Sequence, residues 1–432
     1  MVQTATYGDF SSLLHERFQG RRVPVEVSIE VTHRCPLECQ HCYNNLPMGD
    51  KNARKEELTF EEHLRLLDEL VDLGCLWLLY TGGEIFARND FLDIYTAAKK
   101  RGFLITLFTN GTMITPRVAD HLAKYRPFNI EITLYGATRE TYEALTRIPG
   151  SFDRCMKGIA LLLERGLPLK LKTVPTSVNV HEVYAMKRFA EEDLGVEFKF
   201  DPLVNPRTDC SQSPLAVRLT PEQAVALEFH DPVRRGEYLR LAEFELAANL
   251  PASSKRYTCG GGHNGCAVDP QGKMTICVLS HRDGYNLRSG SFQDGWDGRL
   301  KDIRAAKNTK ETICTHCRIR SLCSMCPANG ELEGGDAEAP VDFLCQVAHL
   351  RAYALGVSVP EHGDCACCPG GNQHSSLSEA ATRINMNSAT GTDVILLPPP
   401  RSNSLLPVLD SRGGCSAGGC SSCGTHIEHR PQ

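Results

Sequence analysis

The stretch VPVEVSIEVTHRCPLECQHCYN, residues 23–44, decides the fold. Its first nine residues are rich in Val and Ile, which predicts a β-strand over 23–31. Cys35, Cys39 and Cys42 follow directly, so we expect them on one loop at the carboxyl end of this strand. Parallel α/β folds place their functional sites at the carboxyl ends of strands, which makes this loop the first candidate site.

Five further apolar segments repeat the strand pattern. They lie at residues 76–80, 103–108, 129–134, 169–174 and 197–200. Helix start signals separate them, among them a capping box of Thr59 with Glu62 and a Thr115-Pro116 pair. Six β–α repeats predict a parallel sheet, because parallel neighbours need a crossover helix. Six units fit a partial barrel or an open doubly wound sheet, and the spacing alone does not choose between them.

The composition of the 432-residue chain is that of a globular protein, with 41% hydrophobic and 23% charged residues. Its net charge of −5 argues against a nucleic-acid partner held by a global basic field. No apolar run approaches the ~18 residues that span a bilayer, and the N-terminus lacks the features of a signal peptide. We therefore expect a cytoplasmic protein with neither a nucleic acid nor a membrane as partner.

Twenty cysteines are the unusual feature of the composition. Thiols stay reduced in the cytosol, and clustered thiolates usually bind metal. Three thiolates on the 35–42 loop would leave one iron of a four-iron cluster open to an external ligand. The alternatives are a zinc site completed by His33 or His41, or cysteines without a shared role. Tyr43 follows the last cysteine, and its ring either packs on a cofactor base or serves ordinary packing.

A Thr81-Gly82-Gly83-Glu84 turn follows the second strand, on the same edge of the sheet as the three-cysteine loop. Glycines let a backbone approach a ligand closely, and a carboxylate beside them can pair with an ammonium group. A plain glycine turn is the alternative. The position of the turn, one β–α unit after the loop, favours a role in ligand binding.

The CxxxCxxC loop and the Gly-Gly-Glu turn together resemble the radical S-adenosylmethionine (AdoMet) superfamily, over roughly residues 23–231. The resemblance implies a partial (β/α)6 TIM barrel in which Cys35, Cys39 and Cys42 hold a [4Fe–4S] cluster and AdoMet chelates its fourth iron. It also implies further AdoMet-binding residues: Gly82, Gly83 and Glu84 for the methionine ammonium, Thr133 near methionine and ribose, and Arg154, or else Arg147, for the carboxylate.

The resemblance also implies the chemistry. A reduced cluster passes one electron to the AdoMet sulfonium, and the resulting 5′-deoxyadenosyl radical abstracts a hydrogen atom from a substrate. An electron donor such as flavodoxin or ferredoxin would reduce the cluster. The acid or base that completes the reaction stays unknown, although Tyr135 and Asp201 point toward the barrel rim in the predicted strands.

Eight more cysteines follow within ninety-odd residues: Cys259, Cys266, Cys277, Cys314, Cys317, Cys323, Cys326 and Cys345. One or two structural zinc sites are one interpretation of these pairs. Downstream of a radical AdoMet core, however, they resemble the SPASM domain, which carries two auxiliary [4Fe–4S] clusters. The resemblance assigns Cys259, Cys266, Cys277 and Cys326 to the first cluster and Cys314, Cys317, Cys323 and Cys345 to the second. Two residues separate Cys323 from Cys326 where the usual pattern has three, so this division stays open.

We expect four segments along the chain. They are an N-terminal extension (1–22), the radical AdoMet core (23–250), the SPASM-type domain (251–355) and a low-complexity, mostly disordered tail (356–432). The tail carries Cys365, Cys367, Cys368, Cys415, Cys420 and Cys423. An extra metal site, a precursor-like segment and no catalytic role are the three interpretations of the last three. Outside these groups, Cys75, Cys155 and Cys210 are expected to be buried packing thiols.

The function expected from this resemblance is the post-translational modification of a ribosomally synthesised peptide. Only about twenty residues precede the first strand, so we expect either a separate leader-peptide-binding protein or capture of the leader by the barrel rim. A SPASM-type enzyme acting on a small molecule such as a tetrapyrrole is the first alternative. A non-catalytic iron–sulfur or zinc protein is the second, and the Gly-Gly-Glu turn argues against it because an electron carrier needs no cofactor seat.

Overall fold

The computed structural model describes residues 7–18, 20–248, 254–280 and 282–390. The chain divides into two compact units. The first contains residues 1–202 and 253–308, and the second contains residues 203–252 and 309–432. These units differ from the expected segments 23–250 and 251–355, because residues 203–252 group with the second unit and residues 253–308 with the first.

A nine-stranded sheet forms the centre of the first unit, in the order β11-β10-β9-β1-β4-β5-β6-β7-β8. Its parallel strands at the predicted positions are β1 (Glu26–Glu30), β4 (Trp77–Thr81), β5 (Leu104–Thr109), β6 (Asn129–Thr133), β7 (Leu169–Thr173) and β8 (Glu197–Phe200). The α/β class with a mostly parallel sheet is thus confirmed.

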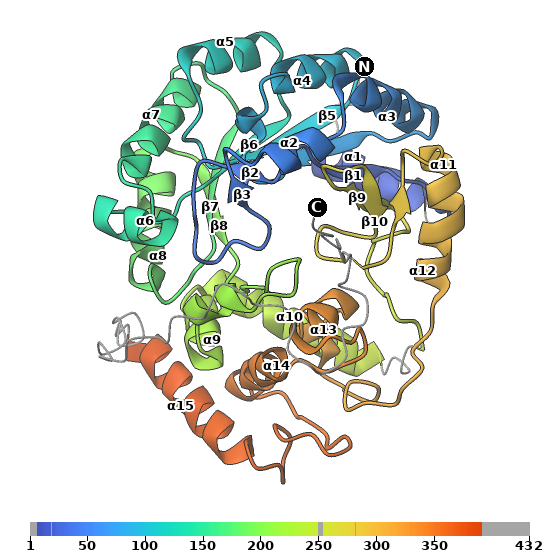
Figure 1. Ribbon diagram of the computed structural model, residues 1–432. Coiled ribbons are helices and arrows are strands. Elements are labelled where there is room, and N and C mark those ends of the chain that lie inside the picture. Colours follow the sequence, from blue (N-terminus) through green and yellow to red (C-terminus); the bar gives the residue numbers. More distant parts are fainter. Residues whose placement is uncertain (1–6, 19, 249–253, 281, 391–432) are drawn as a thin grey trace, which may run out of the picture. The chain divides into compact units, whose positions relative to one another are not determined.

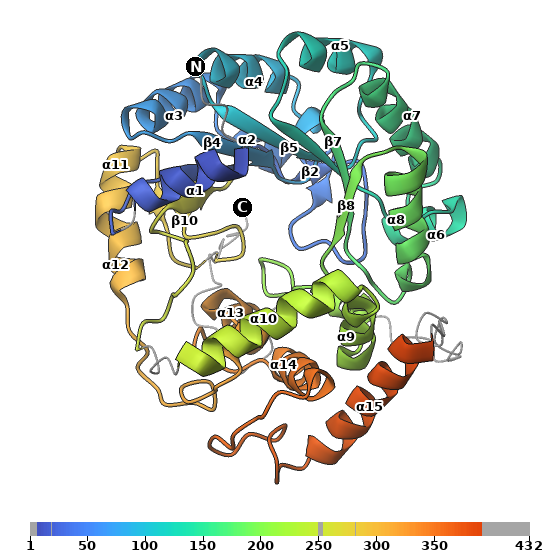
Figure 2. The ribbon, with the colours of Figure 1, turned by 180° about the vertical axis from the view of Figure 1, so that it is seen from behind.

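Helices connect these strands and cover one face of the sheet (Figures 1 and 2). They are α3 (Phe60–Asp72), α4 (Phe91–Lys100), α5 (Pro116–Lys124), α6 (Arg139–Thr146), α7 (Ser151–Leu163) and α8 (Val183–Arg188). The predicted capping box of Thr59 and Glu62 begins α3, and Thr115 caps α5 ahead of Pro116. The local start signals therefore set these two helix ends.

The two faces of the sheet differ in chemistry. Ile29, Tyr80, Leu107, Ile132 and Leu171 are fully buried on the helix-covered face. Successive side chains of a strand point to opposite faces. The opposite face, which we call the open face, therefore carries Thr81, Phe108, Glu131, Thr133, Lys172 and Lys199. This face is the polar one, as a surface that binds a ligand requires.

The remaining elements of the first unit extend the sheet or flank it. They are α1 (Tyr7–Arg17), β2 (Arg34–Cys35), β3 (Leu46–Pro47), α2 (Lys51–Glu56), β9 (Gly265–Val268), β10 (Lys273–Thr275), β11 (Tyr285–Asn286), α11 (Phe292–Gly295) and α12 (Lys301–Ala305). Strand β9 pairs in parallel with β1, and β10 and β11 continue the sheet antiparallel. The cysteine-rich region thus begins as part of the sheet.

The second unit is helical. Its helices are α9 (Pro221–Phe229), α10 (Pro232–Ala248), α13 (Pro327–Gly334), α14 (Asp342–Leu355) and α15 (His374–Thr390). A hydrophobic core that includes Phe229, Leu322, Leu350 and Ile384 joins α9, α10, α14 and α15. In that core the buried Arg351 guanidinium donates to both carboxylate oxygens of Glu228, at 2.8 and 2.9 Å.

Helix α15 adds a packed element to the segment from residue 356, which we expected to be mostly disordered. Leu377, Ala380, Ala381 and Ile384 are buried at helical spacing, and α15 packs on α14 and α9. The segment folds because this one apolar stripe finds a helical partner, although its composition is otherwise polar. Residues 391–432, with Cys415, Cys420 and Cys423, lie outside the described part of the chain.

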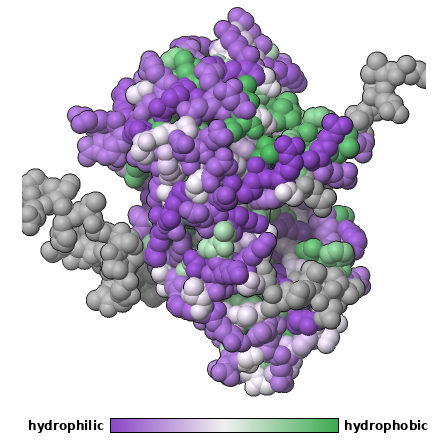
Figure 3. All heavy atoms as spheres, turned by 90° about the vertical axis from the view of Figure 1, so that its right-hand side faces the viewer, coloured by the Kyte–Doolittle hydropathy of each residue, from purple (hydrophilic) through white to green (hydrophobic). Residues whose placement is uncertain are grey.

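Figure 3 shows a mainly hydrophilic surface on the face that it presents, with smaller apolar areas. Within the described residues, we find no helix that is both long enough and apolar enough to cross a bilayer.

Candidate functional site

The three-cysteine loop is held against the end of α6. The Glu38 amide donates to the Thr146 carbonyl at 3.0 Å, and the Gln40 amide donates to the Leu145 carbonyl at 3.2 Å. Cys35 is buried at the end of β2, whereas Cys39 and Cys42 are half-buried on the loop. The backbone contacts thus present three thiols from one short loop at the carboxyl end of β1.

Two side chains donate hydrogen bonds to these sulfurs. Asn110 Nδ2 donates to Cys35 Sγ at 3.5 Å, and the Tyr135 hydroxyl hydrogen-bonds to the Cys39 thiol. Burial raises the pKa of Cys35 to about 12 and the pKa of Cys39 well above its usual value. Thiols so buried are protonated until a cation replaces the proton, which is the behaviour of a metal-ligand loop.

The glycine turn contacts the strand that leads into this loop. The Gly83 amide donates to the Thr32 carbonyl at 2.7 Å, and the Glu84 amide donates to the Arg34 carbonyl at 3.0 Å. A Cβ on Gly82 would lie 2.2 Å from the Thr32 oxygen, and a Cβ on Gly83 would lie 2.3 Å from the oxygen of residue 33. Only glycine allows this approach, so both glycines position the cysteine loop.

Glu84 is the buried carboxylate of the site, with 1% of its surface exposed. It accepts hydrogen bonds from the Thr109 hydroxyl (2.8 Å), the Asn110 amide (2.8 Å) and the Phe86 amide (3.2 Å). Burial raises its pKa to about 7. Among the described residues no basic side chain forms an ion pair with it, so a bound ammonium group would supply the missing positive charge.

The sequence analysis missed the residues that link Glu84 to Cys35. Thr109 ends β5, and Asn110 follows it with its amide on Glu84 and its side chain on Cys35. The available signal was the Thr109-Asn110-Gly111 turn, which follows the third strand on the same edge as the cysteine loop. Three strand ends thus meet at one set of hydrogen bonds.

A second buried carboxylate, Glu30, anchors the far end of the loop. It accepts hydrogen bonds from Asn44 Nδ2 at 2.6 Å and the Tyr43 hydroxyl at 3.2 Å, and His33 Nε2 lies 3.4 Å away. Tyr43, which we expected beside a cofactor base, is therefore tied to β1 through its hydroxyl group. Its role toward a cofactor stays a prediction.

The two candidate arginines differ in position. Arg147 Nη2 donates to Gln40 Oε1 at 3.2 Å, which places Arg147 beside the three-cysteine loop. Arg154 is exposed on α7, and its Nη1 donates to the Pro149 carbonyl at 3.5 Å. The structure therefore does not bring Arg154, the first candidate, to this site. Asp201, the other residue expected at the rim, is exposed after β8.

The open face carries a cluster of charges that the sequence analysis also missed. Lys199 Nζ lies 2.8 Å and Lys172 Nζ lies 3.2 Å from the Glu131 carboxylate. Lys172 also lies over the Phe108 ring, and burial lowers its pKa to about 7. Thr133, an expected AdoMet contact, ends β6 in register with Lys172. These residues line the face on which a ligand of the cysteine loop would lie.

The first unit also contains three of the expected auxiliary-cluster ligands, and they lie in three different environments. Cys259 is exposed, and Cys277 is half-buried against Ile276. Cys266 lies in β9 in register with Val27. Burial raises the pKa of its thiol well above the usual value, and the other titratable groups that shift this pKa are Cys75 and Arg22. Because Val27 is fully buried on the helix-covered face, Cys266 points into packed core.

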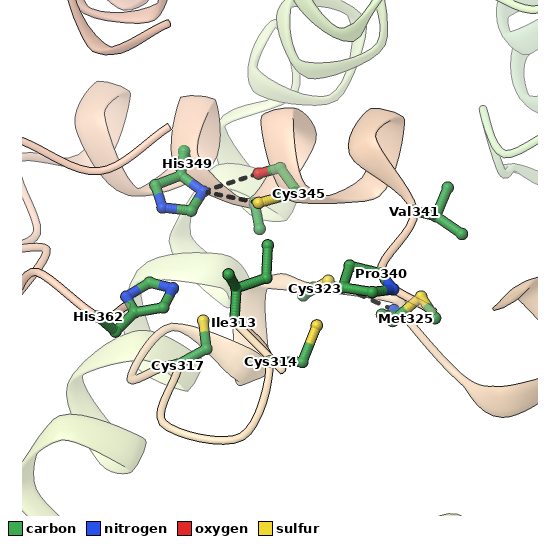
Figure 4. Close-up of a pocket in the computed structure, with 11 residues that line it drawn as sticks. Ile313, Cys314, Cys317, Cys323, Met325, Pro340, Val341, Cys345, His349 and His362 are labelled. Carbon is green, nitrogen blue, oxygen red and sulfur yellow. Dashed lines mark hydrogen bonds between the residues drawn. The ribbon is translucent and has the colours of Figure 1, made fainter. Parts of the chain in front are cut away.

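In the second unit, four of the expected ligands line one small cavity of about 30 Å³. They are Cys314, Cys317, Cys323 and Cys345 (Figure 4). Cys326 lies nearby in sequence as the cap of α13. His349 and His362, which the sequence analysis did not select, line the same cavity. Thiols and imidazoles around one cavity are a donor set that suits metal.

Comparison with known proteins identifies the family. The model of the radical SAM superfamily matches residues 29–190. A PqqA peptide cyclase of Granulibacter bethesdensis is 30% identical over 360 residues, which cover 78% of this chain and 93% of that protein. The chain belongs to the radical SAM superfamily. It is a radical SAM enzyme, and its family binds a [4Fe–4S] cluster and AdoMet.

Two further comparisons agree with this membership. An AdoMet-dependent heme synthase of Methanosarcina barkeri is 25% identical over 338 residues, covering 72% of this chain and 94% of that protein. Streptococcus suis SuiB, solved with its precursor peptide SuiA, shares the radical SAM fold with a TM-score of 0.55 and 16% identity, over 76% of this chain and 79% of SuiB. The expected membership of the SPASM subgroup is confirmed.

Proposed function

We propose that this radical SAM enzyme abstracts a hydrogen atom from a ribosomally synthesised peptide. The observation that carries the proposal is the pair of hydrogen bonds through Asn110 that joins Cys35, one of the three thiols on the loop, to the buried carboxylate of Glu84, which has no ion-pair partner among the described residues. This pair lies at the carboxyl ends of parallel strands. The peptide substrate class is supported by the PqqA peptide cyclase, which matches this chain over most of its length.

In this proposal Cys35, Cys39 and Cys42 hold the [4Fe–4S] cluster, and AdoMet binds its open iron. The buried thiols and Glu84, which forms no ion pair with any described residue, fit this pair of cofactors, because a bound cation favours deprotonated thiols and an ammonium group balances a buried carboxylate. When bound, the pair supplies the 5′-deoxyadenosyl radical. For the AdoMet carboxylate we propose Arg147 in place of Arg154, since only Arg147 bonds to the loop.

The chain's own residues would orient the cofactors and exclude water. Asn110 and Tyr135 donate to two of the sulfurs, and such hydrogen bonds tune the reduction potential of a cluster. Gly82 and Gly83 lock the glycine turn to the cysteine strand. Thr133 lies at the end of β6 on the open face, where a substrate C–H bond would meet the radical.

The second unit would hold an auxiliary [4Fe–4S] cluster on Cys314, Cys317, Cys323 and Cys345, which line one cavity. A cluster with four thiolates can accept the electron that remains after hydrogen abstraction. Of the expected ligands of the other auxiliary cluster in the first unit, Cys259 is exposed and Cys277 is half-buried. Cys266 is not supported as a ligand of this cluster, because that thiol lies in packed core.

A tetrapyrrole substrate is the second candidate, and the match to the AdoMet-dependent heme synthase, over 72% of this chain, favours it. A non-catalytic iron–sulfur or zinc protein is set aside, since the relatives are named enzymes. A leader-peptide-binding protein and a flavodoxin or ferredoxin are the partners that we propose for the peptide reaction.

The proposal is tested by AdoMet cleavage. Anaerobically reconstituted, reduced enzyme should form 5′-deoxyadenosine, measured by liquid chromatography with mass spectrometry. Cys39→Ala should abolish the product, while Cys210→Ser, a half-buried cysteine outside the candidate site, should keep it. Formation of the product by Cys39→Ala at the wild-type rate would refute the assignment. Deuterium transfer into 5′-deoxyadenosine from a labelled peptide, rather than from a labelled tetrapyrrole, decides between the two substrates.

A further inference from the structure

A compact set of thiols and imidazoles lies between α14 and the loop that follows it. His349, His362, Cys365 and Cys368 each offer one ligand atom, and these atoms all lie within 4.8 Å of one another. All four residues are buried, with at most 6% of their surface exposed. The two cysteines of this set, Cys365 and Cys368, belong to the tail segment, and the sequence analysis assigned them no role.

The spacing of these atoms fits a single metal ion. Four ligands at tetrahedral zinc–sulfur and zinc–nitrogen bond lengths lie about 3.3–3.8 Å apart. Here His349 Nε2 lies 3.4 Å from Cys368 Sγ and 3.8 Å from Cys365 Sγ. The His362 ring also faces Cys368 Sγ, which lies 3.2 Å from Nδ1 and 3.9 Å from Nε2. A four-iron cluster separates its ligands more widely, because each of them binds a different corner of a cube.

Backbone carbonyls orient both imidazoles. His349 Nδ1 lies 2.8 Å from the Cys345 carbonyl oxygen, an interaction drawn in Figure 4, and His362 Nδ1 lies 3.1 Å from the Pro360 carbonyl oxygen. A ring nitrogen that donates to a carbonyl carries the proton, which leaves Nε2 of His349 free to bind metal, while His362 presents both ring nitrogens to Cys368 Sγ.

Two neighbouring cysteines are distinguished from the set by their contacts. Cys345 and Cys367 form a second set with His349 and Cys365. However, Cys367 Sγ donates to Gln373 Oε1 at 3.3 Å. Cys345 Sγ lies 3.7 Å from Cys365 Sγ, and it is the cysteine of these two sets that lines the cavity together with the other expected cluster ligands, Cys314, Cys317 and Cys323. Cys345 therefore remains available to an auxiliary cluster, and Cys367 has a partner of its own.

We propose that His349, His362, Cys365 and Cys368 bind one zinc ion with a structural role. Binding would release two thiol protons, so that Zn²⁺, two thiolates and two neutral imidazoles form a site with no net charge. A neutral site can be fully buried at little electrostatic cost. With four protein ligands, no position stays open for catalysis.

The site would fasten the loop after α14 to that helix. Residues 357–373 contain no regular helix or strand, and α15 begins directly after them. Cys345 precedes His349 by one helical turn, so the same stretch of α14 carries a ligand of the proposed zinc ion and a ligand of the proposed auxiliary cluster. The zinc ion would thus hold α15 in place and fix the turn that presents Cys345.

Metal analysis of the full-length, anaerobically purified protein tests this inference. We expect about one zinc per chain, and X-ray absorption at the zinc edge should resolve two sulfur ligands at about 2.3 Å and two nitrogen ligands at about 2.0–2.1 Å. Cys368→Ser and His362→Gln should each remove at least half of the zinc and leave the iron content unchanged. Cys367→Ser, in the same motif, is the matched control and should keep the zinc.

Three outcomes would overturn the inference. One is a wild-type protein that holds its full iron but does not take up zinc when zinc is added. Another is Cys368→Ser losing iron instead of zinc, which would make Cys368 a cluster ligand. The third is Cys367→Ser losing zinc while Cys368→Ser keeps it. The wild-type spectrum needs no variant to fold, and none of these measurements depends on AdoMet cleavage or on the proposed substrate.

Discussion

Lys172 shows how one residue of the open face is tuned by its surroundings. Its ammonium group faces Glu131 and the Phe108 ring, yet desolvation outweighs both and lowers the pKa to about 7. Lys199 competes for the same carboxylate at 2.8 Å. At neutral pH the side chain is therefore poised between its charged and neutral forms, on the face where we propose that the substrate lies.

Lys172 should make stability depend on pH. Between about pH 7 and pH 10 the unfolded chain keeps the lysine proton and the folded chain does not, so the free energy of unfolding rises with pH. Below pH 7 both states are protonated and the cost of burying the charge is constant. In urea denaturation from pH 7.5 to pH 9, the free energy of unfolding of the wild type should increase relative to that of Lys172→Met, by up to about 1 kcal/mol per pH unit. A difference that is constant over this range would contradict the lowered pKa.

Among the elements, the junction of β4 with β2 depends on the absence of two side chains. The sequence analysis interpreted Gly82 and Gly83 as glycines that approach a ligand, and the structure shows that they approach the backbone of residues 32–34. A ligand role for these glycines stays a prediction, and their contact with that backbone is a separate reason for the absence of side chains. The partner could not be predicted, because local sequence does not say which strand lies beside a turn.

Gly83→Ala should disrupt this junction. Its Cβ would lie 2.3 Å from a backbone oxygen of residue 33 and 2.6 Å from that of Arg34, so the strand that carries Cys35 must move. We expect the iron bound per chain to fall by about one cluster and 5′-deoxyadenosine formation to fall at least tenfold. Gly49→Ala is the control, since a Cβ there meets nothing within 4 Å. Full iron content and activity in Gly83→Ala would show that the junction is unimportant.

Helix α15 offers a test of packing in the segment expected to be disordered. Ile384 is 1% exposed in the core shared with α14 and α9, and Met386 on the same helix is 64% exposed. Ile384→Ala should lower the free energy of unfolding by about 2–4 kcal/mol, because it removes buried methyl groups and leaves a cavity. Met386→Ala should change it by less than about 0.5 kcal/mol. Equal effects of the two substitutions in urea denaturation would mean that α15 is not packed.

For the whole molecule, the sequence predicts what local patterns encode. The strands and the first helix ends follow from apolar runs and capping residues, and the three-cysteine loop follows from its spacing. His349 meets Cys365 and Cys368, which are 16 and 19 residues away, only because the chain turns back after α14. Such contacts depend on tertiary packing, so they appear in the structure and not in the sequence.

The proposed assignment of cysteines to metal follows from the same packing. Cys266 was expected to bind the first auxiliary cluster, but it lies in β9 on the helix-covered face, with Cys75 and Arg22 acting on its thiol. A packing thiol can be replaced by a small apolar residue, whereas a cluster ligand cannot. Cys314, in contrast, lines the cavity that we assign to the second auxiliary cluster.

Cys266→Ala should therefore bind as much iron as the wild type after anaerobic reconstitution, while Cys314→Ala should lose about four irons per chain. The measurement is iron and acid-labile sulfide per chain, with Mössbauer spectra to count the four-iron clusters. Both variants should keep the cluster of the three-cysteine loop. Its presence is detected because the spectrum of this cluster changes when AdoMet is added. A loss of about four irons in Cys266→Ala would instead mean that Cys266 is a cluster ligand. Strand β9 would then have to leave its register with β1, so that the thiol could reach a cluster.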